Sequence, residues 1–439
     1  MSPQYDVIIV GARPAGASLA ARLGQQGVRT LLLERASLPS LPAASSPIIY
    51  SPVMKLLDET GAKEAEYARG TARIRRVIGH SRAFSATIRL PMAHGRDYAY
   101  AIDRARFDAA LFDHAAGFAS VEARQHYAVT DLLWEDGRVV GVVGRTRGGQ
   151  DEPIRARLVV GADGRFSLVA RKVNAAESDV YDDYPTSLLY AYWRGVRPYD
   201  AGGPTAVAYE GGYGYGLLVM DSADGTTAVT VEGQPHLLEP GTLSAEERYL
   251  ALVRSNPQIA ARLDGAEMVT RVQGMKRIGN LYRQPGGPGW ALVGDAYHQH
   301  DPLDGQGIFN ALFSAKSLAW AIRYWLRREK TWPEALDWYD ETVRIKTYGM
   351  YRRTLSSVRE NLYSDRDVPG WALQGIRWVM EDPAMHDLMG KLLTRQIPPE
   401  VVTLSTPAVM LGAMLRGPLR DLGLGIRDWG LGSKAFPEK

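Results

Sequence analysis

The sequence predicts a mixed α/β protein (α+β overall), and three observations carry this prediction. Residues 5–35 read as strand, glycine-rich turn, helix and strand, the order of a parallel βαβ unit. Residues 138–143 alternate as an antiparallel strand does, and tyrosine-rich, strand-like segments fill 180–275. Apolar residues recur at helical spacing after residue 307 and again after residue 331. With 439 residues, and roughly 150 residues per domain, about three folding units are expected.

Composition narrows the class of protein. Hydrophobic residues make up 45% and charged residues 23%, as in soluble globular chains. The net charge, 52 − 49 = +3, is too small to favour nucleic acid or an anionic membrane, so a small-molecule partner is expected. The absence of cysteine excludes disulfides, thiolate metal sites, iron–sulfur clusters and cysteine nucleophiles.

Both ends of the chain bear on localisation. An apolar strand is reached by Val7, which leaves no room for a secretory leader, so a cytoplasmic protein is expected. The longest apolar stretch near the C-terminus, residues 401–415, carries Ser405 and Pro407 and is shorter than the ~20 residues that span a bilayer. We therefore expect no transmembrane helix.

The first strand is expected at residues 6–10 (DVIIV), a continuous apolar run typical of a buried parallel strand. The next turn carries Gly11 and Gly16, opens a helical stretch and is followed by a second buried strand that ends at Glu34. In a dinucleotide fingerprint, such glycines permit the tight turn and the close helix approach, and the N–H groups at the helix start bind pyrophosphate. Glu34, 23 residues after Gly11, stands where an acidic residue accepts the ribose hydroxyls.

The middle glycine of the fingerprint is replaced by Arg13, so that G-x-G-x-x-G has become G-x-R-x-x-G. The backbone of Arg13 must approach the pyrophosphate despite its side chain, whose positive charge can add to the phosphate site. The alternative interpretation is an ordinary βαβ unit with a glycine-rich turn.

Two later strands also end in turns with acidic residues. Residues 158–160 (LVV) precede the sequence GADG at 161–164. Residues 290–293 (WALV) precede GDAYHQHDPLDGQG at 294–307, after which apolar residues step four and three apart along one helix face. The last glycines of this segment are therefore expected at a helix N-terminus.

With Arg104-Ala105-Arg106-Phe107, these segments resemble the FAD-dependent oxidoreductases of the p-hydroxybenzoate hydroxylase type, a superfamily that also holds geranylgeranyl reductase-like proteins and flavin-dependent halogenases. In that family an Arg-x-x-hydrophobic sequence starts a helix, and Asp103 is the expected N-cap here. The resemblance covers most of residues 5–330 and implies a Rossmann-like FAD-binding domain. It assigns FAD binding to Gly11, Arg13, Ala15, Gly16, Glu34, Arg35, Arg104, Asp163, Gly294, Asp295, Pro302, Gly305, Gln306, Gly307 and Ile308.

The resemblance also implies how the flavin is held. Asp295 accepts hydrogen bonds from the ribityl hydroxyls, and Pro302 lies against the isoalloxazine ring. The N–H groups around residues 305–307 face flavin N1 and the C2 carbonyl, where the positive end of the long helix stabilises the anionic reduced flavin. The spelling at Phe309 and Asn310 is nearer to the reductase-like branch than to the aromatic hydroxylases.

Three regions are expected along the chain. Residues 1–180 and 270–330 form a discontinuous FAD-binding domain, which contains a β-meander at 121–160 with a turn at Asp136-Gly137. Residues of about 73–100 are assigned either to this domain or to the second one, the antiparallel substrate-binding sheet at 181–269. Residues 331–439 form a helical C-terminal region, whose expected roles are to cap the cavity, to form a homodimer interface or to touch a membrane surface.

Tyrosines crowd the predicted substrate sheet, and the candidate substrate contacts are Tyr190, Tyr192, Tyr213 and Tyr215. As a set they indicate a bulky apolar or aromatic small-molecule substrate, since binding sites are mostly apolar with a few polar groups. Each of them alone is more simply explained as a core residue of the sheet.

His298, His300 and Asp301, with Asp304 nearby, lie in the loop that is expected to pass the flavin. A histidine with a pKa near 6.5 beside a flavin can transfer a proton, so the first three are candidate catalytic residues. Loop-holding hydrogen bonds are the structural alternative. No metal is expected, since the resembled family needs none and no further ligand cluster is visible.

The leading functional interpretation is an FAD-dependent monooxygenase. NAD(P)H reduces the flavin, molecular oxygen adds to form a C4a-hydroperoxide, and a bound organic substrate is oxygenated. With a single dinucleotide fingerprint, the nicotinamide is a transient visitor or a separate reductase supplies the electrons.

Two alternatives stay open: reduction of isolated double bonds, as in geranylgeranyl reductases, and non-redox use of FAD in a cyclase or binding module. A halogenase is disfavoured, because that branch has a lysine soon after the acidic ribose residue, whereas the first lysine after Glu34 is Lys55. The halogenase strand Trp-x-Trp-x-Ile-Pro is also missing, since residues 212–217 read GYGYGL.

Overall fold

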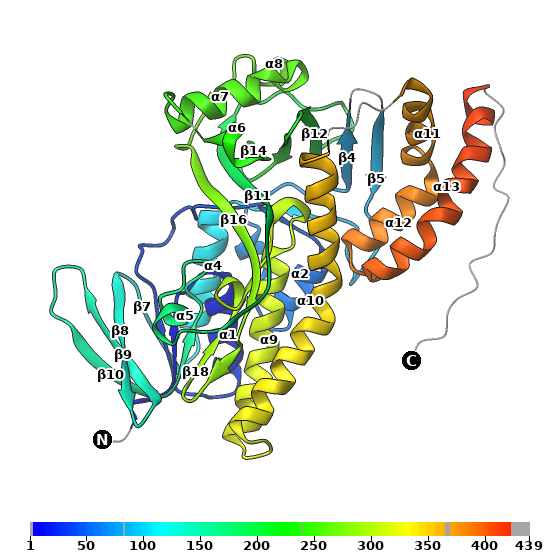
Figure 1. The fold of residues 1–439 in the computed structure, drawn as a ribbon. Helices are drawn as coiled ribbons and strands as arrows, with labels where there is room; N and C mark the ends of the chain where they lie inside the picture. Colours follow the sequence, from blue (N-terminus) through cyan, green and yellow to red (C-terminus); the bar gives the residue numbers. More distant parts are fainter. Residues whose placement is uncertain (1–2, 82–83, 240, 365–368, 423–439) are drawn as a thin grey trace.

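A mainly parallel sheet organises the N-terminal part of the chain. The computed structural model describes residues 3–81, 84–239, 241–364 and 369–422. The parallel strands follow the order β18–β10–β1–β2–β7, which puts the first strand at the centre. Of these strands, β7, β10 and β18 are labelled in Figure 1. These strands are β1 (Tyr5–Val10), β2 (Thr30–Leu33), β7 (Val121–Arg124), β10 (Glu152–Gly161) and β18 (Trp290–Leu292), with β17 (Gly286–Gly287) antiparallel at the edge.

Three helices pack with this sheet: α1 (Pro14–Gln25), α4 (Arg104–Ala116) and α9 (Gly307–Leu326). α1 contacts both of the others. Its buried residues include four alanines, Gly16 and Ser18, whose small size lets neighbouring backbones approach closely. Asp103 caps α4 as expected by accepting from Ala105 N at 2.9 Å. The mixed α/β fold class is confirmed.

An antiparallel meander extends from the same sheet. β8 (Tyr127–Glu135) and β9 (Arg138–Thr146) pair with the first half of β10, and the expected turn is present at Asp136 and Gly137, with φ of 47° and 72°. The predicted start of the meander at Val121 is wrong, because β7 pairs in parallel with β2 instead. α4 delivers β7 to the sheet as a crossover helix does in a βαβ unit.

A second sheet of nine strands lies beside the first. Its path is β19–β16–β11–β14–β13–β12–β4–β5, and β15 pairs with β11. Its strands are β4 (Arg76–His80), β5 (Ser85–Arg89), β11 (Glu177–Arg194), β12 (Ala206–Gly212), β13 (Tyr215–Asp221), β14 (Thr226–Gly233), β15 (Glu267–Met268), β16 (Gln273–Arg283) and β19 (His298–Gln299). The sheet therefore draws strands from well outside residues 181–269.

The two faces of this sheet pack against different partners. The outer face, with Trp193 and Val219, packs under α7 (Ala245–Ser255) and α8 (Pro257–Leu263), next to α6 (Pro235–Leu238). The inner face, with Tyr190 and Tyr192, packs on the two-stranded sheet of β3 (Ile48–Ile49) and β6 (Tyr100–Ala101), and Tyr192 reaches the start of α4.

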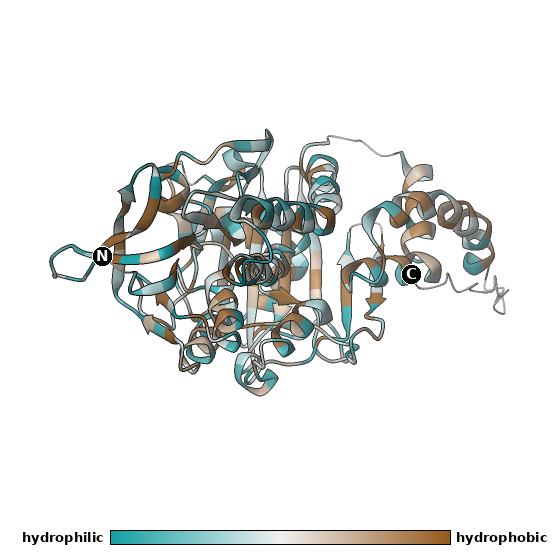
Figure 2. Cartoon of the chain, turned by 90° about the horizontal axis from the view of Figure 1, so that it is seen from below, coloured by the Kyte–Doolittle hydropathy of each residue, from teal (hydrophilic) through white to brown (hydrophobic). Residues whose placement is uncertain are grey.

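The C-terminal region is helical over its described residues. α10 (Trp332–Leu362) runs beside α9, and α12 (Pro383–Leu393) packs on β5, with α11 (Gly370–Met380) and α13 (Pro399–Asp421) beyond it. Apolar residues are prominent along these outer helices (Figure 2). None of the described helices is long and apolar enough to cross a membrane. The part of the predicted helical region at 365–368 and 423–439 lies outside the described residues.

The remaining short elements connect the layers. They are α2 (Ser51–Asp58), α3 (Glu64–Tyr67), α5 (Leu168–Lys172) and the 3₁₀ turns η1 (Gly294–Ala296) and η2 (Pro302–Asp304).

Candidate active site

The glycine-rich turn is closed too tightly for side chains. Gly11 has a φ of +99°, and a Cβ added to it would lie 2.5 Å from Ala162 O. A Cβ on Gly16 would lie 1.9 Å from Gly11 O, so helix and turn touch through backbone alone. The first helical hydrogen bond of α1 runs from Ala17 N to Arg13 O, at 3.0 Å. The backbone N–H groups before Ala17, at the N-terminus of α1, therefore have no partner within the helix.

Glu34 closes this turn from the end of β2. Its side chain is buried, and its two carboxylate oxygens accept from Ala12 N at 3.0 Å and from Ala36 N at 2.9 Å. The carboxylate is thereby fixed beside the turn.

Arg13 replaces the middle glycine of the fingerprint without backbone strain, and its side chain is bound within the protein. Its backbone has φ −77° and ψ −172°, an extended conformation open to any residue, so a glycine is not needed here for backbone reasons. Its guanidinium donates to Asp108 at 2.6 Å and to Ser40 O at 3.1 Å. Asp108 is fully buried, and its Oδ1 also accepts a hydrogen bond from Arg104 Nη2 at 3.1 Å. Arg13 is thus paired with a carboxylate on α4 that it shares with Arg104 of the matched helix start.

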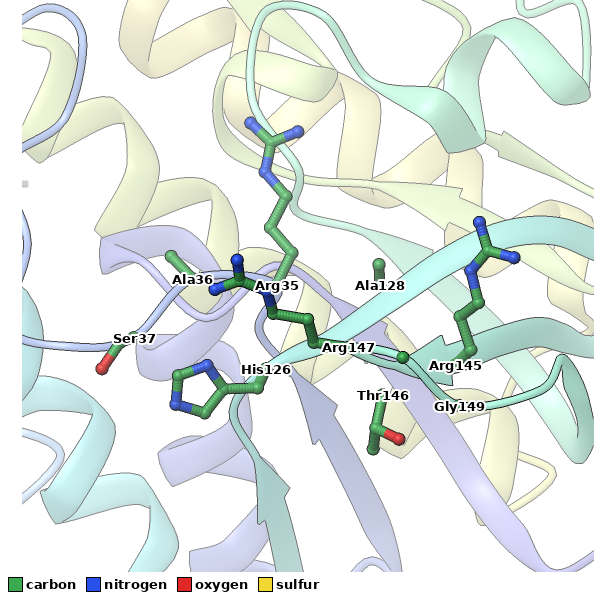
Figure 3. Close-up of a pocket in the computed structure, with 10 residues that line it drawn as sticks. Arg35, Ala36, Ser37, His126, Ala128, Arg145, Thr146, Arg147 and Gly149 are labelled. Carbon is green, nitrogen blue, oxygen red and sulfur yellow. The ribbon is translucent and has the colours of Figure 1, made fainter.

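An open pocket of about 740 Å³ adjoins the end of β2 (Figure 3). Ala36 and Ser37 line it from the segment after Glu34, and Ala128 lines it from β8. Its basic side chains are Arg35, His126, Arg145 and Arg147. Its position next to Glu34 suits the adenosine end of a dinucleotide.

Asp163 caps a helix inside the protein. It accepts from Ser167 Oγ at 2.5 Å and from Leu168 N at 2.6 Å, at the start of α5. Burial raises the pKa of this carboxyl. Its two oxygens are therefore occupied by the chain, although sequence motifs assign it to the cofactor.

Arg165, which was not among the predicted site residues, joins three distant segments. Its guanidinium pairs with Asp295 at 3.2 Å, donates to Gly279 O at 2.9 Å and also donates to His300 O. Its place directly after Asp163-Gly164 was the available signal, but the partners come from β16 and the 294–307 segment. Asp295 stays about one-third exposed (34%), so it can accept further hydrogen bonds.

The first and last cofactor motifs meet in space. A Cβ on Gly294 would lie 2.6 Å from Ala15 Cβ, and Gly294 N donates to Ser314 Oγ of α9 at 3.1 Å. The Gly-Asp turn therefore lies between the start of α1 and the first half of α9.

The two loop histidines are deeply buried. His298 stacks on Tyr282 with ring centroids 4.0 Å apart, and both of its ring nitrogens lack a hydrogen-bond partner. Burial lowers its pKa well below the usual value, and burial with Arg395 and Arg165 lowers the pKa of His300 to about 3. Both imidazoles are therefore neutral at ordinary pH, which removes the cationic acid from the roles considered for them.

A directed hydrogen-bond chain holds His300. Asn310 Nδ2 lies 3.0 Å from His300 Nδ1, and His300 Nε2 lies 2.7 Å from Thr354 Oγ1. Thr354 Oγ1 in turn donates to Asp304 Oδ2 at 2.6 Å. These partners assign the proton of neutral His300 to Nε2. Burial raises the pKa of Asp304.

Asp301 caps η2, the turn that presents Pro302. Its side chain accepts from Leu303 N at 3.0 Å and from Thr186 Oγ1 at 2.6 Å, and its own N–H donates to Asn280 Oδ1 at 2.7 Å. These hydrogen bonds fix the loop conformation. They match the structural alternative considered for Asp301, in which it holds the loop in place.

A further acid, missed from the sequence, faces this loop. Glu232 on β14 lies opposite Leu188 of β11, so it belongs to the inner face of the nine-stranded sheet. It is 8% exposed, its Oε1 has no partner, and burial together with Asp301 raises its pKa well above the usual value. Thr230, two residues earlier on the same face, also has a buried hydroxyl without a partner. An alternating apolar strand gave no sign that these groups would face the loop.

The four candidate tyrosines are divided. Tyr190 and Tyr192 are buried on the inner face, where their hydroxyls donate to Pro42 O and Ile102 O. Tyr215 lies on the outer face and contacts Ser255 of α7 at 2.6 Å, while Tyr213 is 57% exposed in the turn before β13. The set of four is therefore wrong as one site, because Tyr213 stands in the turn between β12 and β13 and Tyr215 points to the opposite face of the sheet from Tyr190 and Tyr192.

The start of α9 presents free amides beside the loop. Asn310 N donates to Gln306 O at 3.0 Å as the first helical bond, so the amides of Gly307 and Ile308 have no intrahelical partner. Nothing lies within 4 Å of a Cβ placed on Gly307. This end of α9 and the loop before it can therefore receive an electron-rich group.

Known proteins match this arrangement over most of the chain. The family model described as FAD binding domain matches residues 4–352. The chain is 25% identical over 405 residues to the digeranylgeranylglycerophospholipid reductase of Methanocella arvoryzae, covering 90% of this chain and 97% of that protein.

Two further matches come from other branches. An uncharacterized aromatic compound monooxygenase of Bacillus subtilis, YhjG, is 25% identical over 360 residues, covering 81% of this chain and 68% of that protein. The structure of the flavin-dependent brominase Bmp2 has a TM-score of 0.74 at 19% identity, covering 95% of this chain and 99% of that chain. The last likeness concerns the fold alone.

Proposed function

The chain belongs to the FAD binding domain family and is an FAD-dependent oxidoreductase, and from this premise we propose that it oxygenates a bulky apolar or aromatic small molecule. Reduction by NAD(P)H and use of molecular oxygen are parts of this proposal. FAD is held between the α1 turn, the pocket at the end of β2 and the loop that leads into α9.

Three observations support the fit of FAD. The Gly11–Gly16 contact leaves a turn that a Cβ would fill, at the amide-rich start of α1. Glu34 and the pocket beside it suit the adenosine. Asp295 keeps an exposed part of its carboxylate for the ribityl hydroxyls. When bound, FAD supplies the redox chemistry, and the chain supplies binding, orientation and a dry surface.

The composition of the inner face is the observation that carries the substrate class. Within residues 188–192 of β11, 216–220 of β13 and 228–232 of β14, no inward side chain is cationic. The polar groups on this surface are tyrosines, Thr230 and the neutral acid Glu232. Such a surface suits an apolar or aromatic molecule with one hydrogen-bonding group, and it disfavours an anionic one.

Halogenation has no support from the position of its characteristic lysine. Lys55 lies on α2, its side chain is 51% exposed, and its ammonium lies 3.9 Å from Glu59. It faces the carboxylate of the residue that caps the C-terminus of the same helix, so we do not propose halogenation.

Reduction of carbon–carbon double bonds is a second candidate. The reductase relative is matched over 97% of its length, against 68% for the aromatic monooxygenase relative. Saturating a double bond requires a hydride and a proton, and Glu232 is a buried group that holds a proton beside the loop. The order of the two candidates rests on the inner-face composition alone.

The deciding experiment follows product mass in oxygen-18 gas. The FAD-loaded protein is supplied with NAD(P)H and a panel of naphthols, quinolones and polyprenyl alcohols. Gain of one labelled oxygen atom supports oxygenation, whereas gain of two hydrogen atoms without label supports double-bond reduction and overturns our first choice. Flavin reduction without any modified product from the panel contradicts the substrate class proposed here.

A further inference from the structure

Arg395, in the turn between α12 and α13, contacts the loop that precedes α9 (residues 298–307, called the flavin loop below). Its Nε and one terminal nitrogen both donate to Gln306 Oε1, at 3.0 and 2.5 Å, and the other terminal nitrogen lies 3.4 Å from Lys346 O. Its guanidinium carbon lies 3.6 Å from the ring centroid of Phe309. The C-terminal helical region is therefore attached to the N-terminal turn of α9 by a cation.

The backbone at Arg395 occupies a position that normally belongs to glycine. Its φ is +51°, its N–H donates to Leu392 O at 2.9 Å, and Gln396 N donates to Lys391 O at 2.8 Å. These two bonds form the Schellman motif that ends a helix, with Arg395 as the left-handed C′ residue. A residue with a side chain costs about 1–2 kcal/mol in this conformation.

The charge of Arg395 is also placed against the usual rule. A cation is unfavourable at a helix N-terminus, where the helix dipole is positive, and the first turn of α9 carries no acidic residue to offset it. Among the described residues, no carboxylate comes within 4.0 Å of the guanidinium; Asp304 acts on it from farther away, and its Oδ2 is occupied by Thr354. Burial lowers the pKa of Arg395, but a guanidinium stays charged at neutral pH.

We propose that Arg395 is a positioning residue that favours the reduced state of bound FAD by stabilising negative charge at the pyrimidine edge of the flavin, with Gln306 as the intermediary. An anion at this point would be stabilised both by the guanidinium, which has no carboxylate within 4.0 Å among the described residues, and by the positive N-terminal end of α9. The inference rests on the proposed placement of FAD at the start of α9. It also gives the C-terminal helices a role that the sequence left open.

The test compares the flavin midpoint potential in variants, measured by anaerobic equilibration with a reference dye. Arg395→Gly and Arg395→Gln are expected to weaken binding of reduced FAD relative to oxidised FAD by about tenfold or more, the order of one charge–charge interaction at an effective dielectric constant of about 20. The midpoint potential then becomes more negative. Arg395→Lys keeps the charge but loses the forked contact, so an intermediate potential is expected.

Arg328 provides a matched control. It has a φ of +60° and is exposed at the far end of α9, where Arg328 N donates to Trp325 O and Glu329 N to Tyr324 O in the same motif. Arg328→Gly removes an arginine and the same backbone strain, and it is expected to leave the potential unchanged.

Thermal unfolding separates the electrostatic role from a structural one. Relief of strain predicts that Arg395→Gly leaves the apoprotein at least as stable as the wild type while its flavin potential falls. An unchanged ratio of reduced to oxidised affinity in both charge-removing variants overturns the inference while FAD binding stands. Failure of the wild-type protein to bind FAD overturns the proposed function instead.

Discussion

The two ends of the proposed FAD site are built by different means. At the nucleotide end, Gly11, Gly16 and Glu34 lie within one βαβ unit, and backbone contacts dominate. At the flavin end, the loop at 298–307 is held by side chains from β14, β16, α10 and the turn before α13. The first end therefore depends on local geometry, and the second depends on burial created by the whole fold.

The sharpest test of the nucleotide end is Gly16→Val. The new Cβ would lie 1.9 Å from Gly11 O and 3.2 Å from Ala162 Cβ, and a backbone oxygen cannot move away without opening the turn. We expect loss of FAD from the purified protein and a lower unfolding temperature, since overpacking costs about 1–3 kcal/mol or more. The ratio of flavin to protein absorbance measures the first effect.

Gly27→Ala is the control for this variant. Gly27 ends the same helix with a φ of +71°, but nothing lies within 4 Å of an added Cβ. The strain of about 1–2 kcal/mol should lower stability and leave FAD content normal. Full flavin occupancy in Gly16→Val would contradict the placement of the pyrophosphate at this turn.

Asp295→Ala tests the point where both ends meet. Loss of a charged hydrogen-bond acceptor is expected to weaken FAD binding by about ten- to hundredfold, measured by titrating apoprotein with FAD. The variant also leaves Arg165 without its ion-pair partner. Asp295→Asn, which keeps one acceptor oxygen, should show a smaller loss. Wild-type affinity in the alanine variant refutes our assignment of this turn to the ribityl chain.

The same contrast explains what could be predicted from the sequence. Features that depend on consecutive residues could be predicted, and the structure contains them: the β1 run, the glycine turn, the Asp103 cap and the Asp136-Gly137 turn. The family resemblance related segments far apart in the chain, and the family match confirms the resemblance itself. Local signals also include the start of α9 after residue 306.

Residues of the flavin end escaped prediction for physical reasons. Glu232 stands in the run TAVTVEG, whose pattern fits either face of a strand, and only the pairing with Leu188 turns it inward. Tyr213 and Tyr215 were grouped with Tyr190 by composition, although a turn and a sheet face separate them. Arg395 lies 89 residues from its partner Gln306, so no motif joins the two.

Glu232→Gln sharpens the contrast at the flavin end through pH. Because the folded-state pKa of Glu232 is raised, the stability that it contributes is full below its unfolded value of 4.5 and is lost as pH rises toward the folded value. Glutamine mimics the neutral acid without titrating. The variant should therefore exceed the wild type in unfolding temperature at pH 8, on the order of a few degrees, with the gap closing toward pH 5.

The exposed Glu267 on β15 provides the control for this measurement. Glu267→Gln replaces an exposed side chain, so it should leave the unfolding temperature close to that of the wild type in the same measurements. A gap between Glu232→Gln and the wild type that does not change between pH 5 and pH 8 shows that the acid is not held neutral. In that event the proton-holding role beside the loop is lost.

Arg13→Gly, which restores the usual fingerprint, should have the smallest effect on FAD. The backbone at this position already adopts an extended conformation, and the guanidinium is hydrogen-bonded to Asp108. We expect FAD affinity to change by less than about threefold, well under 1 kcal/mol. Stability should fall by about 1–3 kcal/mol, because buried Asp108 keeps only Arg104 as a cationic partner. Arg13→Gly combined with Asp108→Asn leaves buried Arg104 without a carboxylate partner, so stability should fall further. A large drop in FAD affinity in Arg13→Gly alone means that Arg13 serves the phosphates directly, so that the nucleotide end also depends on a side chain.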